Sequence, residues 1–202
     1  QRTELSHQQA VHVEQINRCG STLMQIINDV LDFSRLETHA TPLNNQPFNA
    51  VQLAHEAVDM VSSIAGQKGV LLVREFPSEE IEAIGDPLRV KQVMLNLLAN
   101  AVKFTPSGEV SVRCRQLKLD NGAPGLYVEV QDSGIGIPRD AIGHLFQPFS
   151  QASDATIRQY GGSGLGLAVC KRLVDMMNGR IGVNSEPGQG SLFWFQVPIN
   201  SH

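Results

Sequence analysis

The chain has 202 residues, with 16 basic and 20 acidic side chains and a formal net charge of −4 at pH 7. This length can form one compact domain with a good core plus an appendage, or two small domains. The slightly acidic balance excludes a general electrostatic attraction to nucleic acid or to an anionic membrane, and no apolar run approaches the ~20 residues of a membrane span.

The first predicted element is a long helix from about Leu5 to Leu36, which contains no proline and a single glycine. Its apolar residues alternate three and four positions apart, as in the seam of a coiled coil. They are Ile16, Cys19, Leu23, Ile26, Val30 and Phe33. An ordinary amphipathic helix is the alternative, and either kind of helix needs a partner for its apolar stripe.

The segment from Glu37 to Phe48 contains two prolines and two asparagines, so it predicts a linker and a domain boundary. Beyond it, residues 50–65 predict a helix and residues 70–76 a strand. Asp86 followed by Pro87 is typical of a helix start, and the apolar residues after this pair repeat with helical spacing. These apolar residues are Val90, Val93, Met94, Leu97, Leu98 and Ala101.

The second half of the chain predicts mainly strands. Strands at residues 110–117 and 126–130 flank a hairpin-like Asp-Asn-Gly turn. The elements after them are a helix that follows Gly164 and extends to Met177, and strands at residues 180–185 and 191–197. This order predicts a mixed α+β sandwich, with helices on one face of a mostly antiparallel sheet.

Three polar residues of the helix that starts at Pro87 share one face, which differs from its apolar face. Asn96, Asn100 and Lys103 lie at positions i, i+4 and i+7. Asparagine oxygens are hard, neutral ligands that suit Mg²⁺, and a lysine beside them could neutralise phosphate charge. The alternative is a helix whose amides cap nearby loops.

Two glycine-containing motifs follow. Asp132 ends a predicted strand and precedes Gly134 and Gly136, so its carboxylate could accept a hydrogen bond from an amine such as that of adenine, with backbone close to the ligand. A plain Asp-Ser-Gly turn is the alternative. The cluster from Gly161 to Gly166 precedes a helix, whose free amides could receive phosphate oxygens. This cluster matches neither a P-loop nor the dinucleotide fingerprint.

The segment between these two motifs is polar and aperiodic from Gln147 to Tyr160, and it contains Arg158. It predicts a mobile lid over a ligand, with a solvated surface loop as the alternative. Phe146 and Phe149 would then either anchor the lid or belong to the core.

The four motifs, at residues 96–105, 132–138, 146–149 and 161–167, resemble in this order the N box, first glycine box, F box and second glycine box of the histidine kinase catalytic domain. That domain is a member of the Bergerat-fold ATPases. The resemblance runs from about Gln46 to Pro198, and residues 188–193 resemble the closing strand motif of the family. Upstream, residues 23–37 resemble the second helix of the kinase dimerisation domain, particularly in hybrid sensor kinases.

The resemblance implies a two-layer α/β sandwich on a helical stalk. Residues 1–40 would be the second dimerisation helix, and residues 46–200 the catalytic ATP-binding domain. The implied ligands are ATP and Mg²⁺. Asn96 and Asn100 would hold the metal, Lys103 and Arg158 the phosphates, and Asp132 the adenine. The further positions implied for the nucleotide pocket are Phe104, Gly134, Gly136, Ile137, Phe146, Phe149, Tyr160, Gly161, Gly162, Ser163, Gly164, Leu165, Gly166, Leu167 and Ser191.

One position separates branches of the larger ATPase group. Its hydrolases have a glutamate one turn before the metal-binding asparagine, where it polarises the attacking water. This chain has Asn96 there, and an uncharged amide cannot act as a general base. The resemblance therefore implies transfer of the γ-phosphate to a histidine on a dimerisation helix, for relay to the aspartate of a response regulator. A hydrolase of the same fold is the alternative, and it would turn over ATP without an acceptor.

The chain departs from the family at the phosphoacceptor, because the motif His-Glu-x-Arg-Thr-Pro does not occur. His7 and His12 lie near the start but do not match that motif. Either the sequence is cut just before the phosphoacceptor helix, which the abrupt start favours, or the protein has lost that helix. We therefore expect Mg-ATP binding without autophosphorylation. The alternative function is that of a degenerate kinase acting as a nucleotide-sensing or protein-interaction module.

The expected partners are a response regulator or receiver domain and, through the dimerisation helices of the full-length protein, a second copy. Homodimerisation would be weakened in this chain, because half of the usual four-helix bundle is missing. Cys19, Cys114 and Cys170 show neither pairing nor metal-ligand spacing, so we expect reduced core cysteines in a cytoplasmic domain. Any contact with the inner (plasma) membrane would be through the parent protein, and no nucleic acid partner is expected.

Overall fold

The computed structural model describes residues 42–150 and 164–199, together with scattered positions between Ser6 and Leu31. The described positions from Gln8 to Leu31 are helical, in agreement with the predicted N-terminal helix. Of its predicted seam, Ile16, Leu23 and Val30 are described, and their exposed fractions are 69%, 58% and 43%. The other three seam positions lie outside the described residues.

The main sheet has five strands in the order β2-β4-β5-β7-β6. These strands are β2 (Val70–Glu75), β4 (Gly108–Lys118), β5 (Pro124–Asp132), β7 (Gly190–Pro198) and β6 (Arg180–Glu186). Only β2 and β4 pair in parallel; every other neighbouring pair in this sheet is antiparallel. The predicted strands and the hairpin between β4 and β5 are thus confirmed.

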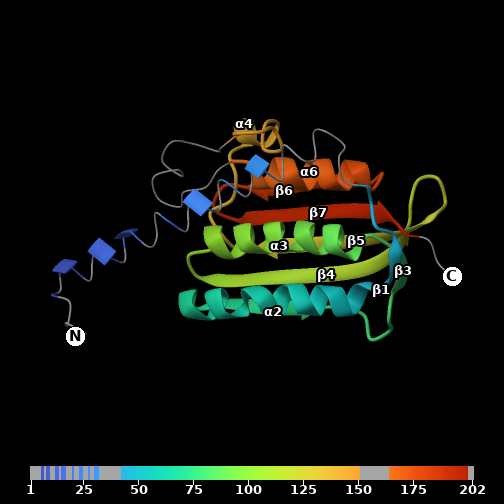
Figure 1. Ribbon diagram of the computed structural model, residues 1–202, viewed down its shortest axis with the longest axis horizontal. Coiled ribbons are helices and arrows are strands. Elements are labelled where there is room, and N and C mark those ends of the chain that lie inside the picture. The colour runs from blue at the N-terminus through green and yellow to red at the C-terminus, as the bar shows by residue number, and fades with distance from the viewer. Residues whose placement is uncertain are drawn as a thin grey trace.

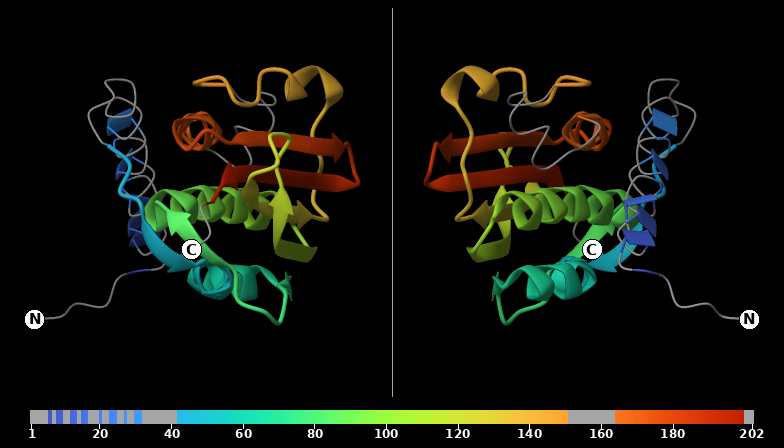
Figure 2. Two further views of the ribbon diagram at one scale, coloured as in Figure 1. Left: turned by 90° about the vertical axis from the view of Figure 1, so that its right-hand side faces the viewer. Right: turned by 90° about the vertical axis from the view of Figure 1, so that its left-hand side faces the viewer.

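Three helices cover one face of this sheet, so the predicted two-layer sandwich is confirmed (Figures 1 and 2). They are α2 (Ala50–Lys68), α3 (Pro87–Phe104) and α6 (Gly166–Met176). Figure 1 shows α3 along the middle of the sheet, between α2 and α6. Among the described residues, no helix is both long and apolar enough to cross a membrane. Cys114 and Cys170 are buried free thiols, as expected of core cysteines.

Helix α3 forms where the sequence predicts it. Asp86 is its N-cap and accepts a hydrogen bond from the Arg89 amide at 3.1 Å, while Pro87 occupies the first turn, where a missing N–H costs nothing. The six predicted apolar positions are each at most 2% exposed. They pack in one core with the inward side chains of β5, including Leu126 and Val128. The apolar face of α3 is therefore fixed against the centre of the sheet.

The predicted linker from Glu37 to Phe48 needs a correction. Its last residues belong to strand β1 (Gln46–Asn49), which pairs antiparallel with β3 (Glu82–Gly85) in a separate two-stranded sheet. Pro47 is compatible with this strand because a two-stranded sheet has only edge strands, where a missing donor can face away from the partner. Strand β3 and the short helix α4 (Arg139–Ile142) were not predicted.

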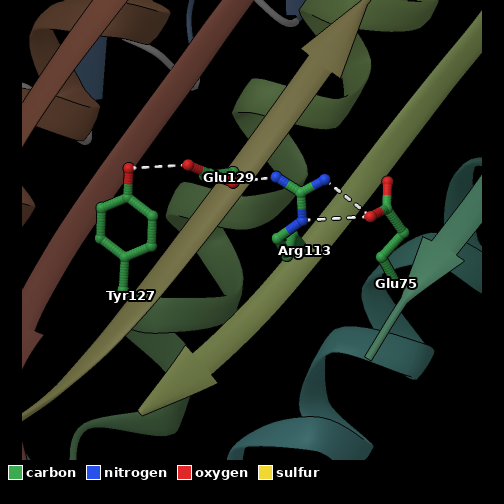
Figure 3. Close-up of polar contacts among 4 residues, drawn as sticks. All are labelled: Glu75, Arg113, Tyr127 and Glu129. Atoms are coloured by element: carbon green, nitrogen blue, oxygen red, sulfur yellow. Dashed lines mark hydrogen bonds and ion pairs between the residues drawn. The ribbon is translucent and has the colours of Figure 1, made fainter. Parts of the chain in front are cut away.

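Polar side chains tie three strands together on the sheet face opposite the helices (Figure 3). Arg113 of β4 forms ion pairs with Glu75 of β2 at 2.6 Å and with Glu129 of β5 at 2.7 Å. The Tyr127 hydroxyl donates to Glu129 at 2.9 Å, and the Tyr127 ring stacks on Trp194 of β7. This network connects neighbouring strands on the face of the sheet that the helices do not cover.

We predict that Asp86→Ala lowers the free energy of unfolding by about 1–2 kcal/mol, because it removes the N-cap of α3. The same carboxylate also accepts from the Asn44 amide at 2.9 Å, so its loss leaves two amides without their acceptor. The measurement is urea unfolding. Asp120→Ala serves as the control, since Asp120 is exposed and its ion pair with the exposed Arg180 contributes little. Equal unfolding midpoints for the two variants would contradict the role of this cap.

Candidate functional site

The polar face of α3 meets the start of α6. Asn96, Asn100 and Lys103 are all half-buried, at the edge of the apolar face rather than in open solvent. A Cβ built on Gly166, the first residue of α6, would lie 3.4 Å from Asn96 Oδ1. The fold therefore brings the first and last of the four motifs into contact, although 70 positions separate these two residues.

Helix α6 places a second residue near Asn96. Cys170, one turn after Gly166, is fully buried, and its Sγ lies 4.0 Å from the Val93 carbonyl oxygen of α3. Burial raises the pKa of this thiol to about 12, although the neighbouring Asn96 side chain acts to lower it, so the thiol stays protonated and neutral at physiological pH. Gly166 and Cys170 of one helix thus both lie next to Asn96.

Asp132 is the last residue of β5 and is only 5% exposed. Its Oδ1 accepts a hydrogen bond from the Gly134 amide at 2.9 Å, and the backbone and hydroxyl of Ser191 also hydrogen-bond to the carboxylate. Burial raises the pKa of Asp132, and these hydrogen bonds only partly offset that effect. The site therefore holds a buried carboxylate beside a predicted pocket residue, Ser191.

The glycines after Asp132 are needed for a reason that the sequence did not indicate. A Cβ on Gly134 would lie 2.3 Å from the Phe104 carbonyl oxygen, and one on Gly136 would lie 2.0 Å from the Glu186 carbonyl oxygen. Both distances are too short for any side chain. The backbone of this motif therefore packs directly against the backbone at the end of α3 and at the end of β6. These glycines allow the loop to pack closely against the rest of the protein.

Ser185 links this loop to the closing strands and was missed in the sequence. Its hydroxyl accepts from the Ile137 amide at 2.9 Å, donates to the Gly190 carbonyl at 2.8 Å and lies 3.0 Å from the Ser191 hydroxyl. One sequence signal could have indicated Ser185. It follows Ile181 and Val183 at alternate positions of β6, and both of these pack against the core, so Ser185 is a polar residue on the inward side near the strand end. Ile137 itself packs against the core.

The start of α6 is joined to the third motif. Gly164 has φ of +71°, and a Cβ there would lie 3.0 Å from the Phe149 carbonyl carbon and the Ser150 oxygen. Phe149 is 68% exposed, so its alternative assignment to the core is wrong, whereas Phe146 packs against the core. Among the described residues, no side chain caps the first turn of α6; Leu165 before this turn is fully buried, and Leu167 packs on the core.

Lys103 lies at the other end of the polar stripe, in the last turn of α3. Burial lowers the pKa of its ammonium, which lies 4.9 Å from the centroid of the Phe104 ring. Arg158, Tyr160, Gly161, Gly162 and Ser163 lie outside the described residues. Within the described part, no group of three or more His, Cys, Asp or Glu side chains is placed to hold a metal ion.

The donor chemistry of the polar stripe fits Mg²⁺. Asn96 and Asn100 offer neutral oxygen ligands from successive turns of one helix, both half-buried. Mg²⁺ usually takes one or two protein oxygens and completes its shell with water and substrate phosphates. A site with two amide oxygens, a lysine on the same helix and the start of a second helix fits such shared coordination better than an all-protein cage.

The comparisons with known proteins agree with this arrangement. Residues 85–201 match the family described as histidine kinase-, DNA gyrase B-, and HSP90-like ATPase. The chain belongs to this family, and within it to the catalytic domains of sensor histidine kinases.

Similar individual proteins are histidine kinases. The chain is 38% identical over 200 residues to the signal transduction histidine-protein kinase BarA of Escherichia coli (strain K12), covering 98% of this chain and 22% of BarA. It is also 38% identical over 207 residues to hybrid signal transduction histidine kinase A of Dictyostelium discoideum, covering 98% of this chain and 10% of that protein. The crystal structure of full-length ShkA in complex with AMPPNP superposes with a TM-score of 0.82 and 33% identity, over 99% of this chain and 41% of ShkA. The chain thus spans about a fifth of BarA.

The raised pKa of Asp132 predicts a pH effect on stability. Its ordinary value is 3.8, so above that pH the unfolded chain releases the proton while the folded chain retains it longer. The carboxyl therefore contributes stability that is present at low pH and is lost as pH rises through the folded pKa.

We expect the free energy of unfolding of the parent chain, relative to Asp132→Asn, to fall as pH rises above about 4, by about 1.4 kcal/mol for each pH unit between the unfolded and the folded pKa of this carboxyl. Urea unfolding of both nucleotide-free proteins at several pH values measures this difference. Asp120→Asn is the matched control, because that carboxylate is exposed. A difference that is constant or rises with pH would contradict the assignment.

Proposed function

We propose that this chain binds ATP together with Mg²⁺ and positions the γ-phosphate for transfer to a histidine on a dimerisation helix. The observation that carries this proposal is the contact between Asn96 of α3 and Gly166 at the start of α6. It brings metal-ligand chemistry and a helix N-terminus to one place. Phosphate groups bind readily where such a terminus meets a cation.

The base would be held at the other end of the site. The buried Asp132 carboxylate has acceptor capacity beyond its bonds to Gly134 and Ser191, so it can take a hydrogen bond from the exocyclic amine of adenine. Such a bond compensates a carboxylate whose burial is otherwise unfavourable. Adenine recognition would therefore use a carboxylate that the fold already buries and holds in place.

The phosphates would lie between α3 and α6. Asn96 and Asn100 would hold Mg²⁺, and the amides at the start of α6 would receive phosphate oxygens. Lys103 and Arg158 would neutralise phosphate charge. The ion, when bound, bridges phosphate oxygens and spreads their negative charge, which is the main electrostatic demand of phosphoryl transfer.

Asn96 also favours transfer over hydrolysis. Activation of water requires a nearby base that accepts a proton. A carboxylate could do this, but position 96 has an amide. The role of the domain would then be to hold ATP in line with an external histidine, through positioning and charge neutralisation. The phosphohistidine would next transfer its phosphoryl group to an aspartate of a response regulator or receiver domain.

The rest of the proposed biology concerns the parent protein. Residues 1–40 would be the second dimerisation helix, and the exposed Ile16, Leu23 and Val30 would pair within a homodimer. The domain would work in the cytoplasm, with any membrane anchor elsewhere in the parent protein. The name of BarA, a signal transduction histidine-protein kinase, supports this context.

We predict that calorimetric titration with AMPPNP separates the base site from the metal site. Asp132→Asn should weaken binding about tenfold or more, with or without Mg²⁺, because a hydrogen bond to a charged group contributes about 1.5–3 kcal/mol. Asn100→Ala should bind like the parent chain in EDTA but lose most of the gain that Mg²⁺ provides.

Two matched controls accompany these variants. Asp120→Asn and Asn184→Ala remove the same chemical groups at exposed positions and should leave AMPPNP binding unchanged. If the folded parent chain does not bind AMPPNP, the proposed kinase function is wrong, and a degenerate interaction module takes its place.

A further inference from the structure

A lysine on α2 reaches the far end of α3. Lys68 is the last residue of α2, and its Nζ donates to the carbonyl oxygens of Val102 at 2.6 Å and Lys103 at 2.9 Å. These contacts cross 34 and 35 positions of sequence. As a residue Lys68 is exposed, so nothing in the sequence distinguishes it from an ordinary surface lysine.

The last four carbonyls of a helix have no partner within the regular helix and need others. In α3 the Ala101 oxygen accepts from the amide and hydroxyl of Thr105, at 3.1 and 2.7 Å. The Phe104 oxygen accepts from the Ile135 amide at 3.3 Å. Lys68 supplies the donor for both carbonyls in between. This single side chain therefore satisfies half of the helix end.

That helix end carries two parts of the nucleotide site. One is Lys103, which belongs to the last turn of α3 and is assigned to the phosphates in the proposed function. The Phe104 carbonyl supports the loop after Asp132, where Ile135 donates to it and Gly134 passes so closely that no Cβ fits. A shift of this last turn would thus move the phosphate-binding ammonium and the loop beneath the adenine carboxylate together.

We propose that Lys68 is a positioning residue for the nucleotide site, which it orders by clamping the last turn of α3. The inference rests on the proposed ATP-binding function, since it concerns the geometry of that site. Lys68 would contact neither the adenine nor the phosphates of bound ATP. It acts through the backbone of Val102 and Lys103.

A second lysine provides a matched control. Lys91 also joins α2 to α3, through an ion pair with Glu56 at 2.7 Å. It lies near the start of α3, far along the helix from Phe104 and the loop after Asp132. If lysines between these helices only stabilised their packing, loss of either would have the same kind of effect.

The test uses the 202-residue chain with Lys68→Met, Lys68→Arg and Lys91→Met. In the nucleotide-free state, NMR amide shifts of Gly134 and Ile135 should move in Lys68→Met and stay in place in Lys91→Met. Calorimetric titration with AMPPNP and Mg²⁺ should show a dissociation constant about fivefold higher or more for Lys68→Met alone. Lys68→Arg keeps donors for both carbonyls and should restore binding to within about twofold of the parent chain.

The outcomes are distinct. Unmoved Gly134 and Ile135 amides together with parent-like AMPPNP affinity in Lys68→Met would overturn the inference, while the proposed function would stand. An equal loss of affinity in Lys68→Met and Lys91→Met would also overturn it, because general destabilisation would then suffice. If the parent chain binds no AMPPNP, the proposed function fails; the amide shifts still decide whether Lys68 holds the loop.

Discussion

The structure depends on the packing of α3 against the sheet. Its apolar residues are almost fully buried beneath the helix, and burial of each large one contributes about 1.5–3 kcal/mol. A rotation of the helix would expose Met94 and Leu97 and bury the amides of Asn96 and Asn100 without partners. The direction of the polar stripe is therefore fixed by the core. Because α6 packs on α3, the same constraint brings Gly166 to Asn96.

The end of the proposed site that contains Asp132 is stabilised differently. Asp132 is a buried carboxylate, and its pKa is raised because burial is unfavourable to its negative charge. It is kept in place by backbone contacts that permit no side chain at Gly134 or Gly136. A ligand that donates a hydrogen bond to this carboxylate would relieve part of that unfavourable burial. Binding of such a ligand would couple folding and ligand binding at one residue, as is common at functional sites.

Local patterns in the sequence predicted the parts of the fold that depend on neighbouring residues. Asp86 and Pro87 indicated where α3 starts, and the helical spacing of apolar residues indicated which face is buried. Strand β3 and α4 have only four residues each, too few for a period, and β1 holds a proline that suggested a linker. Among site residues, the motifs indicated Asp132 and Asn96, but not Ser185 or Lys68. Lys68 reaches the end of α3 across 34 and 35 positions, and Ser185 reaches Ile137 across 48, so these contacts exist only in the fold.

This domain is proposed to hold ATP for phosphoryl transfer without hydrolysing it. The most direct measurement follows γ-labelled ATP given to the chain, alone and with a separately supplied dimerisation domain of the same parent protein. We expect labelled histidine on the added domain and almost no free phosphate when that domain is absent, because position 96 provides no base. Steady release of phosphate by the chain alone, with no label on the added domain, would contradict the claim.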